Sequence, residues 1–164
     1  MHLHLICVGR LKAGPERELV CHYVTRAAGI GRSLGVSAVD MREIDESRAR
    51  RPQDRKKEEA KAIRSLLTNQ FGGSATFIAC DEGGENLTSA NFAQRLGRLH
   101  EQGASHLALV LGGPDGLDPE LRAEAAFSVA FGAMTWPHQL ARLMAAEQMY
   151  RALTLLAGHP YHRP

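Results

Sequence analysis

Short apolar runs alternate along the chain with longer segments that have one apolar side. The apolar runs predict buried strands over residues 3–8, 36–44, 75–80 and 106–111, and a fifth apolar run covers residues 129–136. Helices are predicted over residues 15–29, near residues 53–67, from Thr88 past Leu99, from Pro119 to about residue 126, and over 138–156. This alternation predicts an α/β fold with a mostly parallel, buried sheet flanked by helices.

Three of the predicted strands end in segments of similar character. These segments are Cys80-Asp81-Glu82-Gly83-Gly84, Gly112-Gly113-Pro114-Asp115-Gly116 and residues 132–137. Open parallel sheets bind ligands at the carboxyl ends of their strands, and glycine lets a ligand approach the backbone. One glycine pair alone is most simply a tight turn, and 81–84 is expected to close the third strand. Three such segments together favour a ligand cleft.

Several well-known sites are missing from the sequence. It has no G-x-x-x-x-G-K-[ST] phosphate loop, no G-x-G-x-x-G after the first strand and no G-x-S-x-G nucleophile turn. Histidine, cysteine and acidic residues show no metal-ligand spacing, so no metal is expected; His159 and His162 stand close together but lack partners of that kind. Cys7 and Cys80 lie in apolar strands and are expected to be inert core thiols.

Composition narrows the class of protein. The chain has 164 residues, a formal net charge of +2 and 44% apolar residues, which fits a single domain over residues 1–164. It contains no apolar run long enough to span a bilayer and no signal-peptide pattern. Its three widely spaced cysteines are typical of reduced thiols, so a cytoplasmic protein is predicted. The small net charge does not by itself indicate a nucleic-acid-binding protein.

The last quarter of the chain is richest in candidate chemistry. The predicted helix over 138–156 is apolar around most of its circumference, which predicts burial, in part between subunits. Helical spacing brings His138 to Arg142 and Glu147 to Arg151, the latter as a structural ion pair or a functional one. The closing His-Pro-Tyr-His-Arg, residues 159–163, is expected to fold over a bound substrate; a loose tail is the alternative.

Four motifs together resemble one known family. They are Leu111-Gly112-Gly113-Pro114-Asp115-Gly116, Trp136-Pro137-His138, Ala146-Glu147-Gln148-Met149-Tyr150-Arg151-Ala152 and His159-Pro160-Tyr161-His162-Arg163. They are similar to the RlmH family, ribosomal RNA large-subunit methyltransferases of the SPOUT superfamily. The resemblance implies a C-terminal trefoil knot, a homodimer, and S-adenosylmethionine as the methyl donor. It also implies N3-methylation of pseudouridine 1915 in helix 69 of 23S rRNA.

The resemblance also implies roles for individual residues. The methyl donor is expected to contact Cys80, Gly113, Gly132, Ala133, Met134, Thr135, Trp136 and Pro137. Substrate handling falls to Arg151, supported by Glu147, and to the tail residues His159, Tyr161, His162 and Arg163. His162 is the preferred general base and Tyr161 is expected to stack on the target base. No metal is needed, because a sulfonium is already an activated leaving group. The sequence departs from the common family pattern at Cys80 and Gln139, where leucine and proline are frequent.

The sequence leaves two alternative functions and the role of one charged segment undecided. The alternatives are a related SPOUT enzyme that methylates a ribose hydroxyl, and a non-catalytic ribosome-associated binding protein. Basic residues between 48 and 64 could contact RNA phosphates, but acidic residues in the same segment favour a solvated, internally paired surface. The first part of this segment, 47–54, is expected to be a loop.

Overall fold

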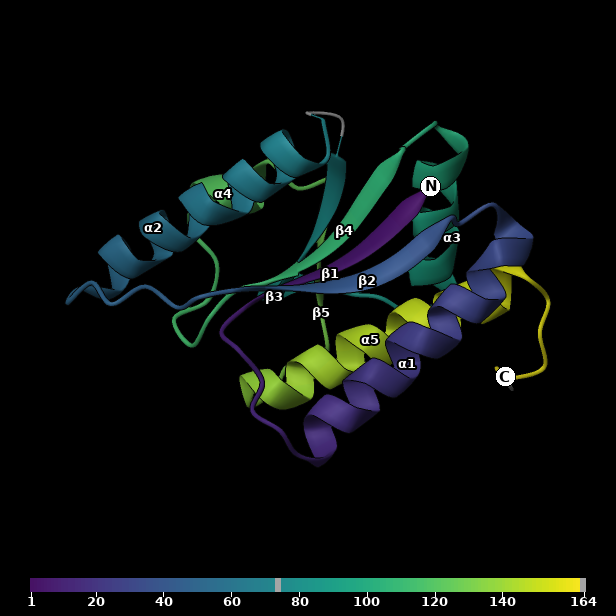
Figure 1. Cartoon of the computed structure of the whole chain (residues 1–164), viewed down its shortest axis with the longest axis horizontal. Helices are drawn as coiled ribbons and strands as arrows, with labels where there is room; N and C mark the ends of the chain where they lie inside the picture. The colour runs from purple at the N-terminus through teal and green to yellow at the C-terminus, as the bar shows by residue number, and fades with distance from the viewer. Residues whose placement is uncertain (73–74, 163–164) are drawn as a thin grey trace.

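The computed structural model describes residues 1–72 and 75–162. The described residues form a five-stranded sheet in the order β2-β1-β4-β3-β5, with every neighbouring pair parallel (Figure 1). Its strands are β1 His2–Val8, β2 Ala38–Ile44, β3 Ala75–Asn86, β4 His106–Leu111 and β5 Phe127–Ala130. The predicted α/β fold with a parallel sheet is confirmed.

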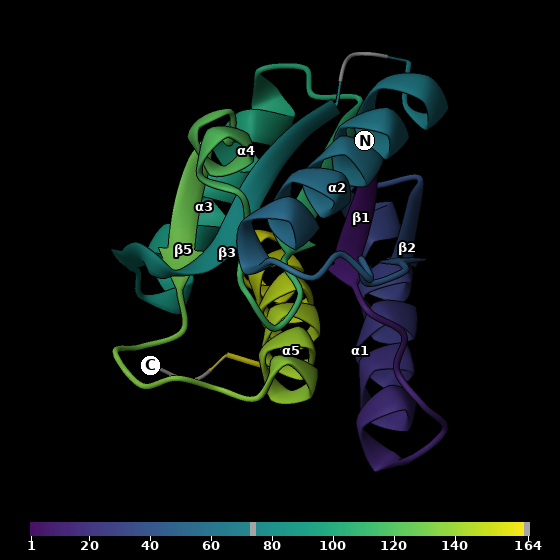
Figure 2. The same cartoon turned by 90° about the vertical axis from the view of Figure 1, so that its left-hand side faces the viewer.

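Helices cover both faces of the sheet (Figures 1 and 2). One face packs against α1 Pro15–Gly31, α3 Ser89–Glu101 and α5 His138–Leu156. The other packs against α2 Pro52–Ser65, which continues into a π-helical turn at Leu66–Gln70, and against α4 Pro119–Ala123. Among the residues that the structure describes, no helix has the length and apolarity required to cross a membrane.

The strands are apolar on both sides because both sides are covered. Along β1, Leu3, Leu5 and Cys7 belong to the core beneath α1, α3 and α5. Ile6 and Val8 point the opposite way, into the core beneath α2 and α4. This double burial explains why the strands read as continuous apolar runs rather than as alternating patterns.

Local chemistry sets where several helices begin. The side chain of Thr88 accepts a hydrogen bond from the Asn91 amide at 3.2 Å, which confirms the predicted cap of α3. Proline occupies the first turn of α1, α2 and α4, where its missing N–H costs nothing. Since α2 begins at Pro52, the end of the segment predicted as a loop is helical instead.

The prediction that β3 ends at Cys80 is wrong. The strand continues to Asn86, and Cys80 and Glu85 both pair with Val129 of β5 across a register shift. A Cβ on Gly84 would lie 2.6 Å from the carbonyl carbon of Val129, so glycine lets the bulged strand stay against its neighbour. Residues 81–84 are therefore a bulge inside a strand and not a turn that closes it.

Candidate functional site

A cleft of about 680 Å³ opens at the carboxyl edge of the sheet. The bulge within β3, the glycine-rich loop after β4 and the loop between β5 and α5 meet there, so the three predicted segments do come together. Of the residues expected to contact a methyl donor, those in the lining are Cys80, Gly113, Gly132, Met134, Thr135, Trp136 and Pro137. Ala133 lies in the same loop and is exposed, but it does not line the cleft.

The loop after β4 depends on glycine for its shape. The Gly116 amide donates to the Gly113 carbonyl at 2.9 Å, and Gly116 has a φ of +82°. A Cβ on Gly112 would lie 2.6 Å from the backbone of Gly116, and one on Gly113 would lie 3.1 Å from a methyl of Val8. Any side chain at Gly112 would therefore force the loop apart at the floor of the cleft.

Two acidic residues hold this loop to the helices beside it. The Arg55 guanidinium on α2 donates from Nε and Nη2 to the two carboxylate oxygens of Asp115, at 2.6 and 2.9 Å. Asp118 accepts hydrogen bonds from the amides of Glu120 and Leu121 at the start of α4, at 3.0 and 3.1 Å. The loop is thus fixed by a two-point ion pair at one end and a helix cap at the other.

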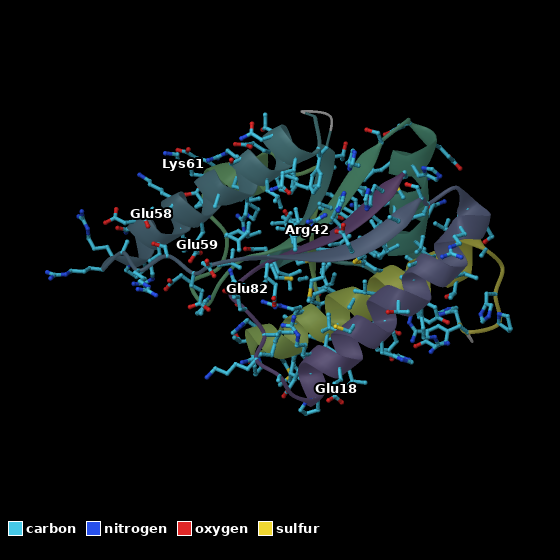
Figure 3. The ribbon with its side chains drawn as sticks, in the orientation of Figure 1. Glu18, Arg42, Glu58, Glu59, Lys61 and Glu82 are labelled. Atoms are coloured by element: carbon cyan, nitrogen blue, oxygen red, sulfur yellow. The ribbon has the colours of Figure 1, made fainter. Side chains whose placement is uncertain are left out.

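A buried carboxylate lies directly beneath the glycine loop. Glu59 of α2 (Figure 3) accepts a hydrogen bond from the Ser47 amide at 3.0 Å, and its oxygens lie 3.3–3.5 Å from the position of a Cβ on Gly113. Burial raises the pKa of Glu59, an effect that the hydrogen bond from Ser47 offsets in part. Glu59 was not among the residues predicted from sequence, because it stands within a run of charges.

Charged side chains of both signs surround the mouth of the cleft. Asp81 accepts hydrogen bonds from the Gly83 amide at 3.0 Å and from Arg122 at 2.7 Å, while Lys56 and Glu82 complete the rim. A ligand that carries both an ammonium and a carboxylate would find an opposite charge for each.

The loop between β5 and α5 presents apolar side chains to solvent. The Trp136 indole donates to the Phe131 carbonyl at 3.1 Å, which draws the loop together across Gly132, whose φ is +102°. Met134 is 73% exposed and Trp136 is 42% exposed. Large apolar side chains this exposed on one short loop mark a contact surface for a ligand or a partner.

A buried arginine anchors α5 next to the cleft. Arg142 is 1% exposed and donates to the carbonyls of Val8 and Gly9 at 3.2 and 2.8 Å, and to Glu43 at 2.6 Å. Glu43 also accepts a hydrogen bond from the Leu11 amide at 2.8 Å. The predicted helical spacing of Arg142 is right, but its role is to attach α5 to the ends of β1 and β2.

The two strand cysteines have little reactivity. Burial raises the pKa of the Cys7 thiol to about 12, and burial likewise raises the pKa of Cys80 well above its ordinary value. Both thiols are therefore protonated at neutral pH, in agreement with the expected inert role.

The predicted substrate-handling residues gather around the second half of α5. Arg151 donates to Glu147 at 2.9 Å, and the Tyr161 hydroxyl donates to the same carboxylate oxygen at 3.1 Å. His162 Nδ1 lies 3.4 Å from Arg151. His159 is exposed and accepts from the Tyr161 amide at 3.2 Å, outside the cluster. Arg163 lies outside the described residues.

The Tyr161 ring is already engaged within the chain. Arg151 and Arg26 lie over it at 4.8 and 5.4 Å from the ring centre, and Tyr150 meets it edge to face at 4.7 Å. Burial, and then hydrogen bonding to Tyr23, raises the pKa of Tyr161. These contacts hold the partly buried ring, and with it the tail, against α5.

One chain does not bring the tail cluster to the cleft. His138 lines the cleft, whereas Arg151 lies thirteen residues further along α5, roughly 20 Å at 1.5 Å per residue. None of the predicted substrate-handling residues in the described part of the chain lines the cleft. The donor-binding loop and the tail cluster both lie in the last quarter of the sequence. Closeness in sequence did not reveal that α5 holds them apart.

A second hollow of about 610 Å³ lies between the two groups. It runs from Phe131 and Gly132 along α5 to Glu147, and it is lined mostly by apolar side chains such as Leu143 and Met144. Leu19, at its edge, is 45% exposed. Together with the exposed loop beside it, this hollow forms an apolar strip from the cleft to the tail cluster.

Comparison with known proteins assigns the chain to a family. The family model described as "Predicted SPOUT methyltransferase" matches residues 1–162. The chain belongs to the SPOUT methyltransferase family.

Within this family, the chain is 52% identical over 163 residues to the protein named ribosomal RNA large subunit methyltransferase H of Beijerinckia indica. It is equally identical over the same length to the protein of that name in Nitrobacter hamburgensis, and each alignment covers 99% of both chains. The resemblance to the RlmH family is therefore confirmed.

Solved structures of methyltransferases resemble the fold more distantly. A probable methyltransferase from Bordetella pertussis aligns with a TM-score of 0.47 and 17% identity, over 92% of this chain and 95% of that one. The SpoU methyltransferase AviRb from Streptomyces viridochromogenes, solved with the cofactor AdoMet, gives a TM-score of 0.46 and 11% identity over 95% of this chain and 58% of that one. The C-terminal trefoil knot, like the single domain over residues 1–164, stays a prediction for this SPOUT methyltransferase.

Proposed function

We propose that this SPOUT methyltransferase transfers a methyl group from S-adenosylmethionine to N3 of pseudouridine 1915 in helix 69 of 23S rRNA. The proposal is supported by full-length relatives whose names state methylation of large-subunit ribosomal RNA. The same proposal predicts that the protein acts on ribosomes in the cytoplasm.

The cleft suits S-adenosylmethionine in size and chemistry. Its volume of about 680 Å³ lies within the usual range of small-molecule sites. Gly112 and Gly113 leave backbone groups accessible for a nucleoside, and Asp81, Lys56 and Arg122 offer charges to an amino-acid moiety. When bound, the donor supplies an electrophilic methyl group on a sulfonium, and the residues that would hold it are those that line the cleft. The chain's own part is to position the methyl group in line with the target nitrogen.

Substrate chemistry is assigned to the cluster on α5. N3 of a uracil ring is protonated at neutral pH, so a group must remove that proton or stabilise the resulting anion. His162 is the preferred base because an imidazole nitrogen can accept the proton, and Arg151 beside it can hydrogen-bond the flanking carbonyl oxygens. Glu147 orients Arg151. Since Tyr161 is held among three neighbours, positioning of the tail is a better role for it than stacking on the target base.

A homodimer explains how the separated groups meet. The apolar strip and the exposed Met134, Trp136 and Leu140 supply a surface that a second copy would cover. In a two-fold arrangement with antiparallel α5 helices, the tail cluster of each chain approaches the cleft of the other. We therefore propose that each active site takes its cleft from one subunit and its tail from the partner.

Mixed dimers test this arrangement directly. Arg151→Ala removes the substrate-handling arginine, and Thr135→Trp fills the exposed side of the cleft in the partner. Each homodimer is expected to lose methyl transfer, while co-expressed heterodimers recover activity at one of their two sites. If the heterodimers stay inactive while both chains are folded and dimeric, the tail does not act across the interface.

Methyl transfer to ribosomes tests the reaction itself. The protein is incubated with labelled S-adenosylmethionine and large subunits that lack the modification, and the labelled nucleoside is identified. Arg151→Ala and His162→Ala are each expected to reduce transfer at least about 100-fold while donor binding by calorimetry is unchanged. Unchanged transfer in Arg151→Ala, His162→Ala and Arg163→Ala would contradict the assignment. A labelled ribose would indicate a 2′-O enzyme, and absent donor binding would indicate a non-catalytic ribosome-binding protein.

A further inference from the structure

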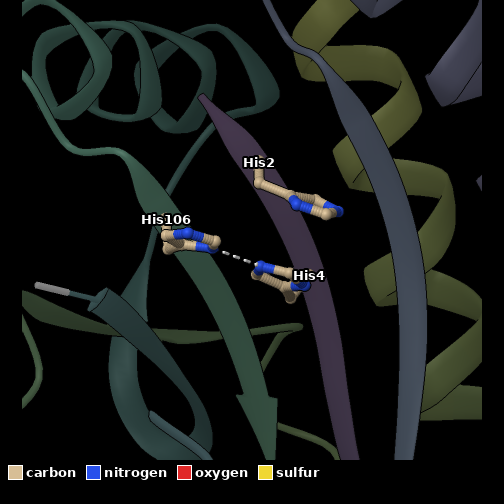
Figure 4. A group of neighbouring side chains, drawn as sticks. All are labelled: His2, His4 and His106. Atoms are coloured by element: carbon tan, nitrogen blue, oxygen red, sulfur yellow. Dashed lines mark hydrogen bonds between the residues drawn. The ribbon is translucent and has the colours of Figure 1, made fainter. Parts of the chain in front are cut away.

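Three histidines meet at the amino edge of the sheet, opposite the cleft (Figure 4). His2 and His4 lie two residues apart on β1 and so share one face of the strand. His106 begins β4 and pairs in register with His2. Each ring offers a nitrogen within 4.8 Å of the other two. The sequence showed no such spacing because His106 is about a hundred residues from the other two and only strand pairing brings it close.

A carboxylate fixes the orientation of the central ring. Asp40, in register with His4 on β2, accepts a hydrogen bond from His4 Nδ1 at 2.7 Å. Burial raises the pKa of Asp40, but hydrogen bonds from His4 and Arg42 outweigh it, so the pKa lies below its usual value. With Nδ1 directed toward Asp40, His4 turns its Nε2 toward His106. Carboxylates oriented in this way commonly stand behind histidines that bind metals.

His106 and His2 supply the other two candidate nitrogen atoms. His4 Nε2 and His106 Nδ1 share a hydrogen bond of 3.0 Å, which a bound ion would replace, and the planes of the two rings differ in direction by 8°. His2 Nε2 is shielded from solvent and makes no hydrogen bond to any described residue, although Asp40 Oδ2 lies 3.4 Å away. Such a buried nitrogen without a hydrogen bond is costly and rare, and a bound ion would satisfy it.

We propose that His2, His4 and His106 form a binding site for a divalent transition-metal ion of the zinc class, with Asp40 orienting His4. Imidazole is a preferred ligand for zinc, and three protein ligands leave one position for water. In this complex His106 binds through Nδ1 and carries its proton on Nε2.

Zinc binding would require the three rings to rearrange. At Zn–N distances of about 2.0–2.1 Å, two ligand nitrogens of a tetrahedral site stand about 3.3–3.4 Å apart. His4 and His106 would exchange their hydrogen bond of 3.0 Å for bonds to the ion and separate by a few tenths of an ångström. His2 now stacks on His4 with 4.3 Å between ring centres, so its partly exposed ring would turn to bring its nitrogen from within 4.8 Å to that distance.

An aromatic ring covers one side of the cluster. Phe71 stacks on His4 at 4.0 Å and closes one side, which leaves the side of His2 for entry.

The site is structural rather than catalytic. β1 has seven residues, so its two ends lie roughly 20 Å apart and the ion stands far from the cleft. Bound metal would tie β1 to β4 directly and to β2 through Asp40. An ion that binds only the folded chain raises its stability by mass action.

Zinc titration of tag-free, chelator-treated protein tests the proposal. Calorimetry is expected to show one ion per chain, and a saturating excess of zinc is expected to raise the thermal unfolding midpoint. His2→Gln and His106→Gln should each weaken binding at least about tenfold, because each removes one of three ligands. His22→Gln removes an exposed imidazole on α1 and serves as the matched control with unchanged affinity.

Three results would overturn the site. They are the absence of stoichiometric binding by the unaltered chain, equal binding by His2→Gln and His106→Gln, and an equal loss in His22→Gln. If His106→Gln does not fold, His2→Gln still tests the site, because the side chain of His2 is partly exposed and its replacement is expected to leave the fold intact. Cobalt supplies an independent readout, because a site of three imidazoles and water gives the intense visible absorption of tetrahedral Co²⁺, and His2→Gln should reduce it.

Discussion

Replacement of the buried arginine on α5 tests how the cleft is held in place. Arg142→Met keeps most of the aliphatic volume but removes three hydrogen bonds, two to main-chain carbonyls and one to Glu43. Hydrogen bonds to a charged group contribute about 1.5–3 kcal/mol each, and the cost of burying the guanidinium offsets part of their sum. Removing one partner of a buried ion pair typically lowers the free energy of unfolding by about 3–5 kcal/mol, and we expect Arg142→Met to lower it by an amount in that range.

Urea unfolding followed by circular dichroism measures this loss. The matched control is Arg10→Met, which breaks the Arg10–Asp45 pair, whose side chains are both more than 70% exposed. The control midpoint should stay near that of the unaltered chain, because exposed ion pairs contribute little. Arg142→Met should also weaken donor binding under conditions where it is folded, since α5 begins at the cleft. A loss below about 1 kcal/mol for Arg142→Met would refute the anchoring role.

Three further changes probe the glycine loop, its Asp115 and the Glu59 carboxylate beneath it. Gly112→Ala should abolish donor binding measured by calorimetry, because its Cβ would lie 2.6 Å from the Gly116 backbone; unchanged affinity would show that the loop adapts. Asp115→Asn loses the two-point ion pair with Arg55 and should weaken donor affinity several-fold, and an equal affinity would show that the pair does not hold the loop. Folding raises the pKa of Glu59, so the protonated carboxyl stabilises the folded chain relative to the unfolded chain. This stabilisation is lost as the pH rises above 4.5, the ordinary pKa of a glutamate. Glu59→Gln should therefore gain stability relative to the unaltered chain between pH 4 and pH 7 in urea unfolding, and a constant difference would contradict the shift.

Local sequence chemistry was enough to place most of the elements. Proline in the first turn and the Thr88 cap mark helix starts through contacts within a few residues, so they can be read without tertiary structure. Strands buried on both faces stand out as apolar runs. The extension of β3 escaped prediction because Asp-Glu-Gly-Gly has the composition of a turn, and pairing with β5 decides its conformation.

The site was predictable only where its residues lie on the loops that end strands. Glycines after three predicted strands indicated the cleft, because parallel strands bring their carboxyl ends to one edge, although the segment after Cys80 is a bulge within β3. Glu59, Arg142 and the histidine cluster depend on contacts between residues far apart in the chain, which composition and spacing do not encode. The roughly 20 Å between cleft and tail likewise follows from the straight α5, not from closeness in sequence.

Mass spectrometry of nucleosides shows whether the protein methylates a single base in large-subunit RNA. Ribosomes from cells that lack the modification are incubated with the protein and S-adenosylmethionine, and fragments that contain helix 69 are analysed. We predict one added methyl group per large subunit, on N3 of pseudouridine 1915, that disappears with His162→Ala. A methyl group on a ribose or at another position, or none at all with donor bound, would contradict the account.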